Sequence, residues 1–162
     1  RSAVDVIKNH VRLQALPARF TMAPDIMQTL NLEDRIALTR AVVSLLDNWG
    51  ATAVQQIALL ALPPATRPGA IRQFRQSTPF PESKQIMERI EHLIGIADAL
   101  RTSYPHNAHM GNIWMNRENH RFDNRAPLAA MLEDGLAGII AVRTHLDCAY
   151  DWNISGSDNK PG

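Results

Sequence analysis

Apolar residues recur at spacings of three and four along most of this chain, and proline-rich turns separate the periodic stretches. That spacing places apolar side chains on one face of an α-helix, whereas a half-buried strand would alternate them with polar ones. Proline interrupts helix interiors, so its positions between the stretches mark helix ends. The pattern predicts an all-α fold.

The middle of the chain carries the clearest helix signals. Asn31 is a suitable N-cap for a helix whose apolar face continues to Trp49, and Gly50 supplies a left-handed stop. Thr52 and Gln55 have capping-box spacing, which predicts a second helix reaching residue 62. A third, short helix is expected at 67–76.

The C-terminal half is predicted to be a second group of helices. The segment 77–81 contains two prolines and is the best linker in the chain. Beyond it, helices are expected at 82–104, 108–115, 127–134 and 136–150. We therefore divide the chain into a helical N-terminal extension (1–30), a helix-turn-helix-like segment (31–80), a C-terminal helical module (81–152) and a flexible tail (153–162).

Composition narrows the class of protein. The chain has 162 residues, 45% hydrophobic and 20% charged, which is typical of a globular protein and excludes a disordered chain. No apolar run reaches the roughly 20 residues that cross a bilayer, so we expect no membrane partner. The single cysteine, Cys148, cannot form an internal disulfide, which favours a reduced, cytoplasmic protein.

The net charge of +1 hides a local basic segment, because residues 51–81 contain no Asp or Glu. Arginine neutralises phosphates, and Arg and Gln can read base edges in the major groove. The predicted DNA-binding residues are Arg67, Arg72, Gln73, Arg75 and Gln76. The alternative is an ordinary solvated helix face, and the stiff Pro63–Pro64 turn departs from the usual helix-turn-helix connection.

No catalytic or metal-binding arrangement emerges from the remaining polar residues. His106, His109 and His120 lie close in sequence but lack further residues at ligand spacing, so we interpret them as surface histidines. His145 and Cys148 share one helix without a separate orienting group, and Cys148 is expected to be buried. We expect no enzyme activity, no metal and no cofactor.

A series of motifs across residues 86–147 resembles a known family. IMERIEHLIGIADALRTSYP forms the long helix, NIWMNREN carries Trp114, and APLAAMLEDGLAGIIAVRTHLD contains the closing helix from Gly135. In this order they resemble the toxin-binding region of Xre/MbcA/ParS-type antitoxins. The loop before Pro127 departs from the family pattern, because residues 123–125 stand where a glycine is usual.

The resemblance implies an antitoxin that silences a RES-domain toxin, a fold that consumes or transfers ADP-ribose from NAD. It also implies a helix-turn-helix before the toxin-binding region, repression of the antitoxin's own promoter, and a homodimer within a hetero-oligomer. Independently, the polar loop is rich in the arginine and aromatic residues that are enriched at interface cores. By family analogy, the last helix would cover the NAD pocket. The predicted toxin-binding residues are Trp114, Arg117, Asn119, Arg121, Arg125, Pro127, Arg143, Asp147 and Trp152.

Two other classes of function stay open. One is a freestanding helix-turn-helix regulator of transcription that has no toxin partner. The other is a helical adaptor that binds a partner protein but not DNA. A mobility shift with adjacent promoter DNA discriminates between them.

Overall fold

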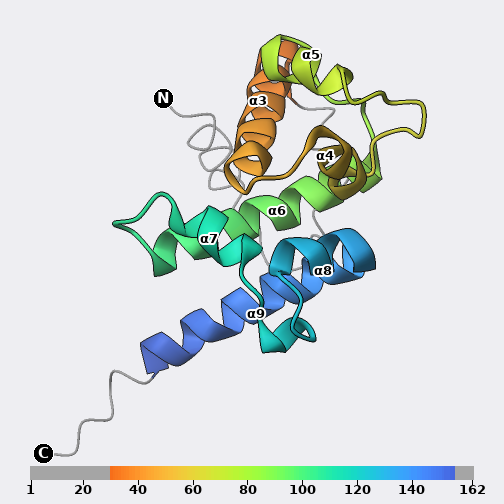
Figure 1. The fold of residues 1–162 in the computed structure, drawn as a ribbon. Helices are drawn as coiled ribbons and strands as arrows, with labels where there is room; N and C mark the ends of the chain where they lie inside the picture. Colours follow the sequence, from red (N-terminus) through yellow and green to blue (C-terminus); the bar gives the residue numbers. More distant parts are fainter. Residues whose placement is uncertain (1–29, 156–162) are drawn as a thin grey trace, which may run out of the picture.

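The computed structural model describes residues 30–155, and this part of the chain consists of helices and their connections (Figure 1). The predicted all-α fold is confirmed. Residues 1–29 and 156–162 lie outside the described part, so the helical N-terminal extension and the end of the tail stay predictions. The helices are α3 (Leu32–Asn48), α4 (Ala53–Leu60), α5 (Ala70–Gln76), α6 (Lys84–Ser103), α7 (Met110–Asn116), α8 (Pro127–Asp134) and α9 (Leu136–Ser155), with a 3-10 helix η1 (His120–Phe122).

The predicted helix caps are present at the starts of α3 and α4. The Asn31 side chain accepts a hydrogen bond of 2.8 Å from the Asp34 N–H. Thr52 and Gln55 make both hydrogen bonds of a capping box. After α3, Gly50 adopts φ +83°, the left-handed conformation expected of it.

Several helix ends differ from the prediction, and α6 and α7 each begin two residues later than expected, at Lys84 and Met110. Helix α4 ends at Leu60, because Ala61 turns into the left-handed region at φ 50°. Helix α5 begins at Ala70 instead of residue 67, because turns at 64–65 and 68–69 precede it. Helix α9 continues to Ser155, past the predicted end at residue 150 and into the segment assigned to the tail.

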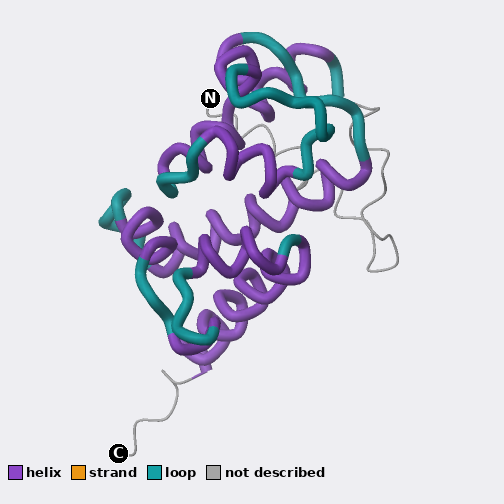
Figure 2. Tube along the Cα trace, turned by 45° about the vertical axis from the view of Figure 1, so that its right-hand side comes forward, coloured by secondary structure: helices purple, strands orange, loops and turns teal. Residues whose placement is uncertain are grey.

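Helix α6 runs through the middle of the molecule, with α3 and α5 towards one end and α9 at the other (Figures 1 and 2). Helix α9 packs along α6, and α8 packs on α9. Buried residues from all seven helices form one core cluster. The prediction that Cys148 is buried is wrong, because Cys148 is exposed on α9.

The segment 77–81 is anchored to the core. Phe80 is 1% exposed, and its ring centroid lies 5.0 Å from that of Phe74 on α5. The Phe80 N–H donates to the buried Thr39 hydroxyl at 2.9 Å. Arg35 of α3 also pairs at 2.8 Å with Glu82, the residue that follows the segment. The predicted domain boundary therefore falls on a segment that joins α3, α5 and α6.

Candidate functional site

Helix α5 presents most of the predicted DNA-binding residues on one exposed face. Ile71 and Phe74 are buried and turn the opposite face towards α3. Arg72, Gln73, Arg75 and Gln76 are all exposed. Arg67 lies outside the helix, in the connection that precedes it.

Arg72 and Arg75 differ in whether their guanidinium groups are already paired with a carboxylate. Arg75 makes a bidentate ion pair with Asp47 of α3, with nitrogen–oxygen distances of 2.9 and 3.1 Å. Arg72 makes no ion pair within residues 30–155. Arg75 therefore holds α5 on α3, whereas Arg72 is available for an anionic partner.

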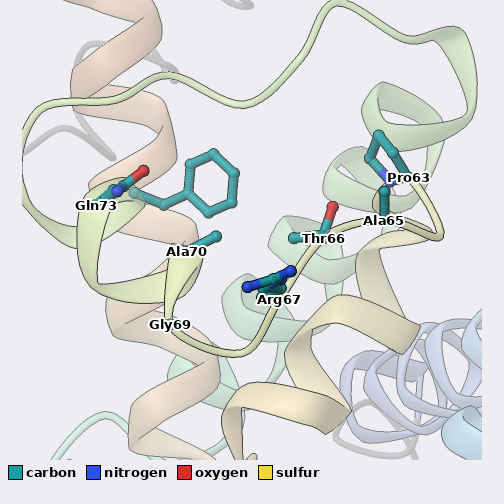
Figure 3. Close-up of a pocket in the computed structure, with 8 residues that line it drawn as sticks. Pro63, Ala65, Thr66, Arg67, Gly69, Ala70 and Gln73 are labelled. Carbon is teal, nitrogen blue, oxygen red and sulfur yellow. The ribbon is translucent and has the colours of Figure 1, made fainter.

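The connection between α4 and α5 forms an open hollow (Figure 3). Pro63, Thr66 and Arg67 line one side of it, and Gln73 and Phe74 of α5 line the other. The connection, residues 61–69, is longer than the 3–4-residue turn of a standard helix-turn-helix. Helix α5 also packs on α3 instead of on α4, so the arrangement departs from that motif.

Three rings from separate elements meet in the C-terminal half. The Trp114 ring of α7 stacks on the His145 ring of α9, with centroids 6.4 Å apart and planes within 10°. Phe122 of η1 meets both rings edge-on, at 6.4 Å from Trp114 and 5.5 Å from His145. This aromatic cluster (Trp114, Phe122, His145) fixes α7, η1 and α9 relative to one another.

Two predicted toxin contacts instead shape the loop between α7 and α8. The Asn119 side chain accepts from the Arg121 N–H at 3.0 Å, and its backbone N–H donates to the Arg125 carbonyl. The Arg125 guanidinium donates to Asp134 at 2.9 and 3.1 Å and to Glu133 at 2.9 Å. These hydrogen bonds raise the pKa of Arg125 above its ordinary value, and the hydrogen bond to Asp134 contributes most. Both side chains are engaged within the chain.

The loop follows a left-handed path without glycine. Asp123 has φ 56° and Asn124 has φ 60°. Asn and Asp enter this region more readily than other non-glycine residues. The departure from the family pattern at 123–125 is thus accommodated by two residues that tolerate the conformation.

We expect Asn124→Gly to raise the free energy of unfolding by up to about 1 kcal/mol, because glycine has no Cβ clash at positive φ. Asn124→Ala is the matched control and should lower it by a similar amount. Urea denaturation measures both. Equal stability of the two variants would contradict a left-handed residue at this position.

The remaining predicted toxin contacts divide into buried and exposed groups. Pro127 is buried in the first turn of α8. Arg143 is half-buried: its Nη1 lies 3.0 Å from His92 Nδ1, and its Nε lies 3.7 Å from the exposed Asp147. Arg117 and Arg121 are exposed on the loop. Trp152 falls within α9, and its side chain is outside the described residues.

His145 is a site residue that sequence reasoning missed. In the sequence, His145 stands out only for its closeness to Cys148. In the structure, it packs in the aromatic cluster. Burial, followed by the nearby charges of Arg121 and His120, lowers the pKa of His145 below its ordinary 6.5. No single-residue signal predicts this, because the partners come from α7 and η1.

The lowered pKa predicts a pH effect on stability. As pH falls below 6.5, the unfolded chain takes up the His145 proton before the folded chain does. The contribution of His145 is therefore retained above pH 6.5 and lost on acidification. Urea unfolding at pH 7.5 and 5.5 should show a smaller difference for His145→Phe than for the wild type. The exposed His106→Gln should keep the wild-type difference, and an unchanged difference in His145→Phe would contradict the assignment.

Neither a metal centre nor a membrane span is found in the part of the chain that the structure describes. Residues 30–155 contain no group of three or more His, Cys, Asp or Glu side chains placed to hold an ion. Within the same range, no helix combines the length and apolarity needed to cross a membrane.

The comparisons with known proteins bear on the C-terminal half. Residues 99–149 match the family model described as antitoxin Xre/MbcA/ParS C-terminal toxin-binding domain. No curated protein and no solved structure gave a match. The matched residues begin in the last turns of α6 and include α7, η1, α8 and most of α9, so they contain the aromatic cluster and its loop. The resemblance inferred from the motifs is confirmed, and residues 99–149 are a C-terminal toxin-binding domain of the Xre/MbcA/ParS antitoxin family.

Proposed function

We propose that this protein is an antitoxin that neutralises a RES-domain toxin by covering its NAD site with residues 114–152. The observation that carries the proposal is the family match at residues 99–149. The exposed Arg117 and Arg121 and the half-exposed Trp114 lie in that region. Arginine and tryptophan are the residues most enriched at the energetic centres of interfaces.

The geometry of α9 suits occlusion. Its C-terminal turns extend beyond η1 and α7 at one end of the molecule (Figure 1). A helix end that projects from a packed body can enter a concave site on a partner without unfolding the body. Neutralisation by this route needs tight binding and no catalytic group on the antitoxin.

Co-expression tests the proposal. The RES-domain protein encoded beside this gene should co-purify with the antitoxin, and growth arrested by that toxin should recover. A catalytically inactive toxin variant is the control for binding without toxicity. Separate elution together with undiminished toxicity would reject the proposal.

We further propose that the exposed face of α5, with Arg67 in the connection before it, contacts operator DNA. The specific observation is an acid-free segment whose Arg67 and Arg72 make no ion pair within residues 30–155. Each phosphate contact contributes about one unit to the slope of log affinity against log salt. Arg67→Ala and Arg72→Ala should each reduce that slope in a promoter mobility shift.

Two outcomes would redirect this second proposal. If the wild-type protein binds toxin but shifts no promoter DNA, it is a helical adaptor. If the wild-type protein shifts promoter DNA but binds no toxin, it is a freestanding regulator of transcription. The homodimer stays a prediction, and the mass of the protein in solution checks it.

A further inference from the structure

A cluster of basic side chains borders the aromatic cluster. His120 and Arg121 are exposed on η1, and His145 is partly exposed on α9. Arg121 and His120 are near enough to act electrostatically on the His145 ring. The 5.5 Å contact between the Phe122 and His145 rings places η1 directly against this part of α9. We call these three residues, His120, Arg121 and His145, the basic cluster.

The basic cluster lacks a carboxylate partner within the described chain. Of the eleven arginines in residues 30–155, five lie within 4.0 Å of a carboxylate oxygen: Arg35, Arg75, Arg101, Arg125 and Arg143. Arg121 forms no such pair among residues 30–155. An exposed arginine without a counter-charge in the described chain is suited to an acidic group from outside the chain.

Charged groups lie near His145 on η1, on α9 and in the loop between α7 and α8, where Glu118 is exposed. Arg121 and His120 on η1 are both basic. On α9 itself, Asp147 is paired with Arg143, and in the loop Asp123 lies 3.9 Å from Arg125. Burial is the largest cause that lowers the pKa of His145, and the charges of Arg121 and His120 act in the same direction.

We propose that the basic cluster is the acceptor site for an Asp or Glu side chain of the toxin, which would lie against Trp114 and Phe122. The inference rests on the proposed antitoxin function and adds the chemistry of the partner surface. Aromatic neighbours exclude water, so a carboxylate–guanidinium pair there is stronger than the same pair in open solvent.

Nucleic acid phosphate is the other anion that could bind here, and two observations favour the toxin. The cluster lies inside residues 99–149, the toxin-binding domain. It also lies at the end of the molecule away from α5, where the proposed DNA contacts are (Figure 1). The experiment below separates the two partners.

The first arm measures the affinity of the full-length protein for a catalytically inactive form of the RES-domain toxin encoded beside it. Arg121→Glu should weaken binding at least about tenfold, because it replaces attraction with repulsion at a desolvated site. Arg121→Lys keeps the charge but loses the planar guanidinium, so its affinity should lie between those of Arg121→Glu and the wild type. Lys84→Glu, an exposed charge reversal at the start of α6, is the matched control and should bind as the wild type does.

The second arm uses pH. Wild-type affinity should rise as pH falls below about 6.5, because a bound carboxylate favours protonated His145, whose pKa burial lowers in the free protein. The variant His145→Gln should show a flatter profile. Thermal unfolding of each variant checks that its fold is intact, above all for His145→Gln, because the His145 ring packs against Trp114 and Phe122.

The outcomes separate this inference from the function on which it rests. Wild-type protein that does not bind the toxin rejects the proposed function and the acceptor site with it. Toxin binding by the wild type, with Arg121→Glu within twofold of it, overturns the acceptor site alone. Loss of promoter binding in Arg121→Glu with toxin binding unchanged assigns the cluster to nucleic acid and also overturns the inference.

Discussion

Replacing Trp49 with alanine is expected to lower the free energy of unfolding by about 3–5 kcal/mol, the usual cost of deleting a buried tryptophan. Trp49 is 1% exposed at the end of α3. Its indole lies against Gly111 of α7, where an added Cβ would be 3.4 Å from Nε1. Its carbonyl also accepts a 2.8 Å hydrogen bond from Asn116. Trp49 thus joins the segment before residue 81 to the toxin-binding domain.

The size of this effect is decisive because small proteins have only about 5–15 kcal/mol of total stability. Urea denaturation followed by circular dichroism measures the loss. Trp49→Phe is the matched control and should retain most of the stability, since it keeps a large ring in the site.

The same variant tests whether the chain has two independent modules. One core predicts that Trp49→Ala shifts a single unfolding transition for the whole protein. Two modules predict a second transition at the wild-type position, arising from an unaffected C-terminal half. The buried Phe80 and the Arg35–Glu82 pair across the predicted boundary favour one transition.

The helices that could be predicted from sequence are those with local determinants. The cap at Asn31, the capping box at Thr52 and the proline at the start of α8 depend on neighbours within four residues. The beginning of α5 and the end of α9 lack such signals. Helix α9 reaches Ser155 in the structure although no residue near 150 marks where it ends.

The roles of individual site residues were harder to predict, because they depend on partners distant in sequence. Arg75 lies on the same short helix as Arg72, and Arg125 lies in the same loop region as Arg121. In the structure, Arg75 is paired because Asp47 of α3 lies beside α5. Arg125 is paired because Asp134, at the end of α8, lies beside the loop. Arginine content predicted the surfaces, whereas the distribution of acidic residues in space decides which arginines are available to a partner.

Gly138→Ala is expected to destabilise the toxin-binding domain by about 2–3 kcal/mol, the range for overpacking a tight core. Gly138 is buried where α9 crosses α8, and an added Cβ would lie 2.4 Å from the Ala130 carbonyl oxygen. The atom that it meets belongs to helix backbone, so the two helices must separate. The single residue Gly135 links them, at φ 62°, and leaves little freedom to adjust.

Two other glycines serve as matched controls for Gly138, since alanine favours helix by about 1 kcal/mol when it fits. A Cβ at Gly69 would meet nothing within 4 Å, so Gly69→Ala should change stability by less than about 1 kcal/mol. A Cβ at Gly95 of α6 would meet the Arg143 guanidinium at 2.6 Å, but this group ends a flexible side chain and can move. We therefore expect thermal unfolding to rank Gly138→Ala well below the other two variants. Because α8 and α9 belong to the toxin-binding domain, Gly138→Ala should also lose toxin at a lower temperature. Equal stability of the three variants would mean that α8 and α9 separate without cost.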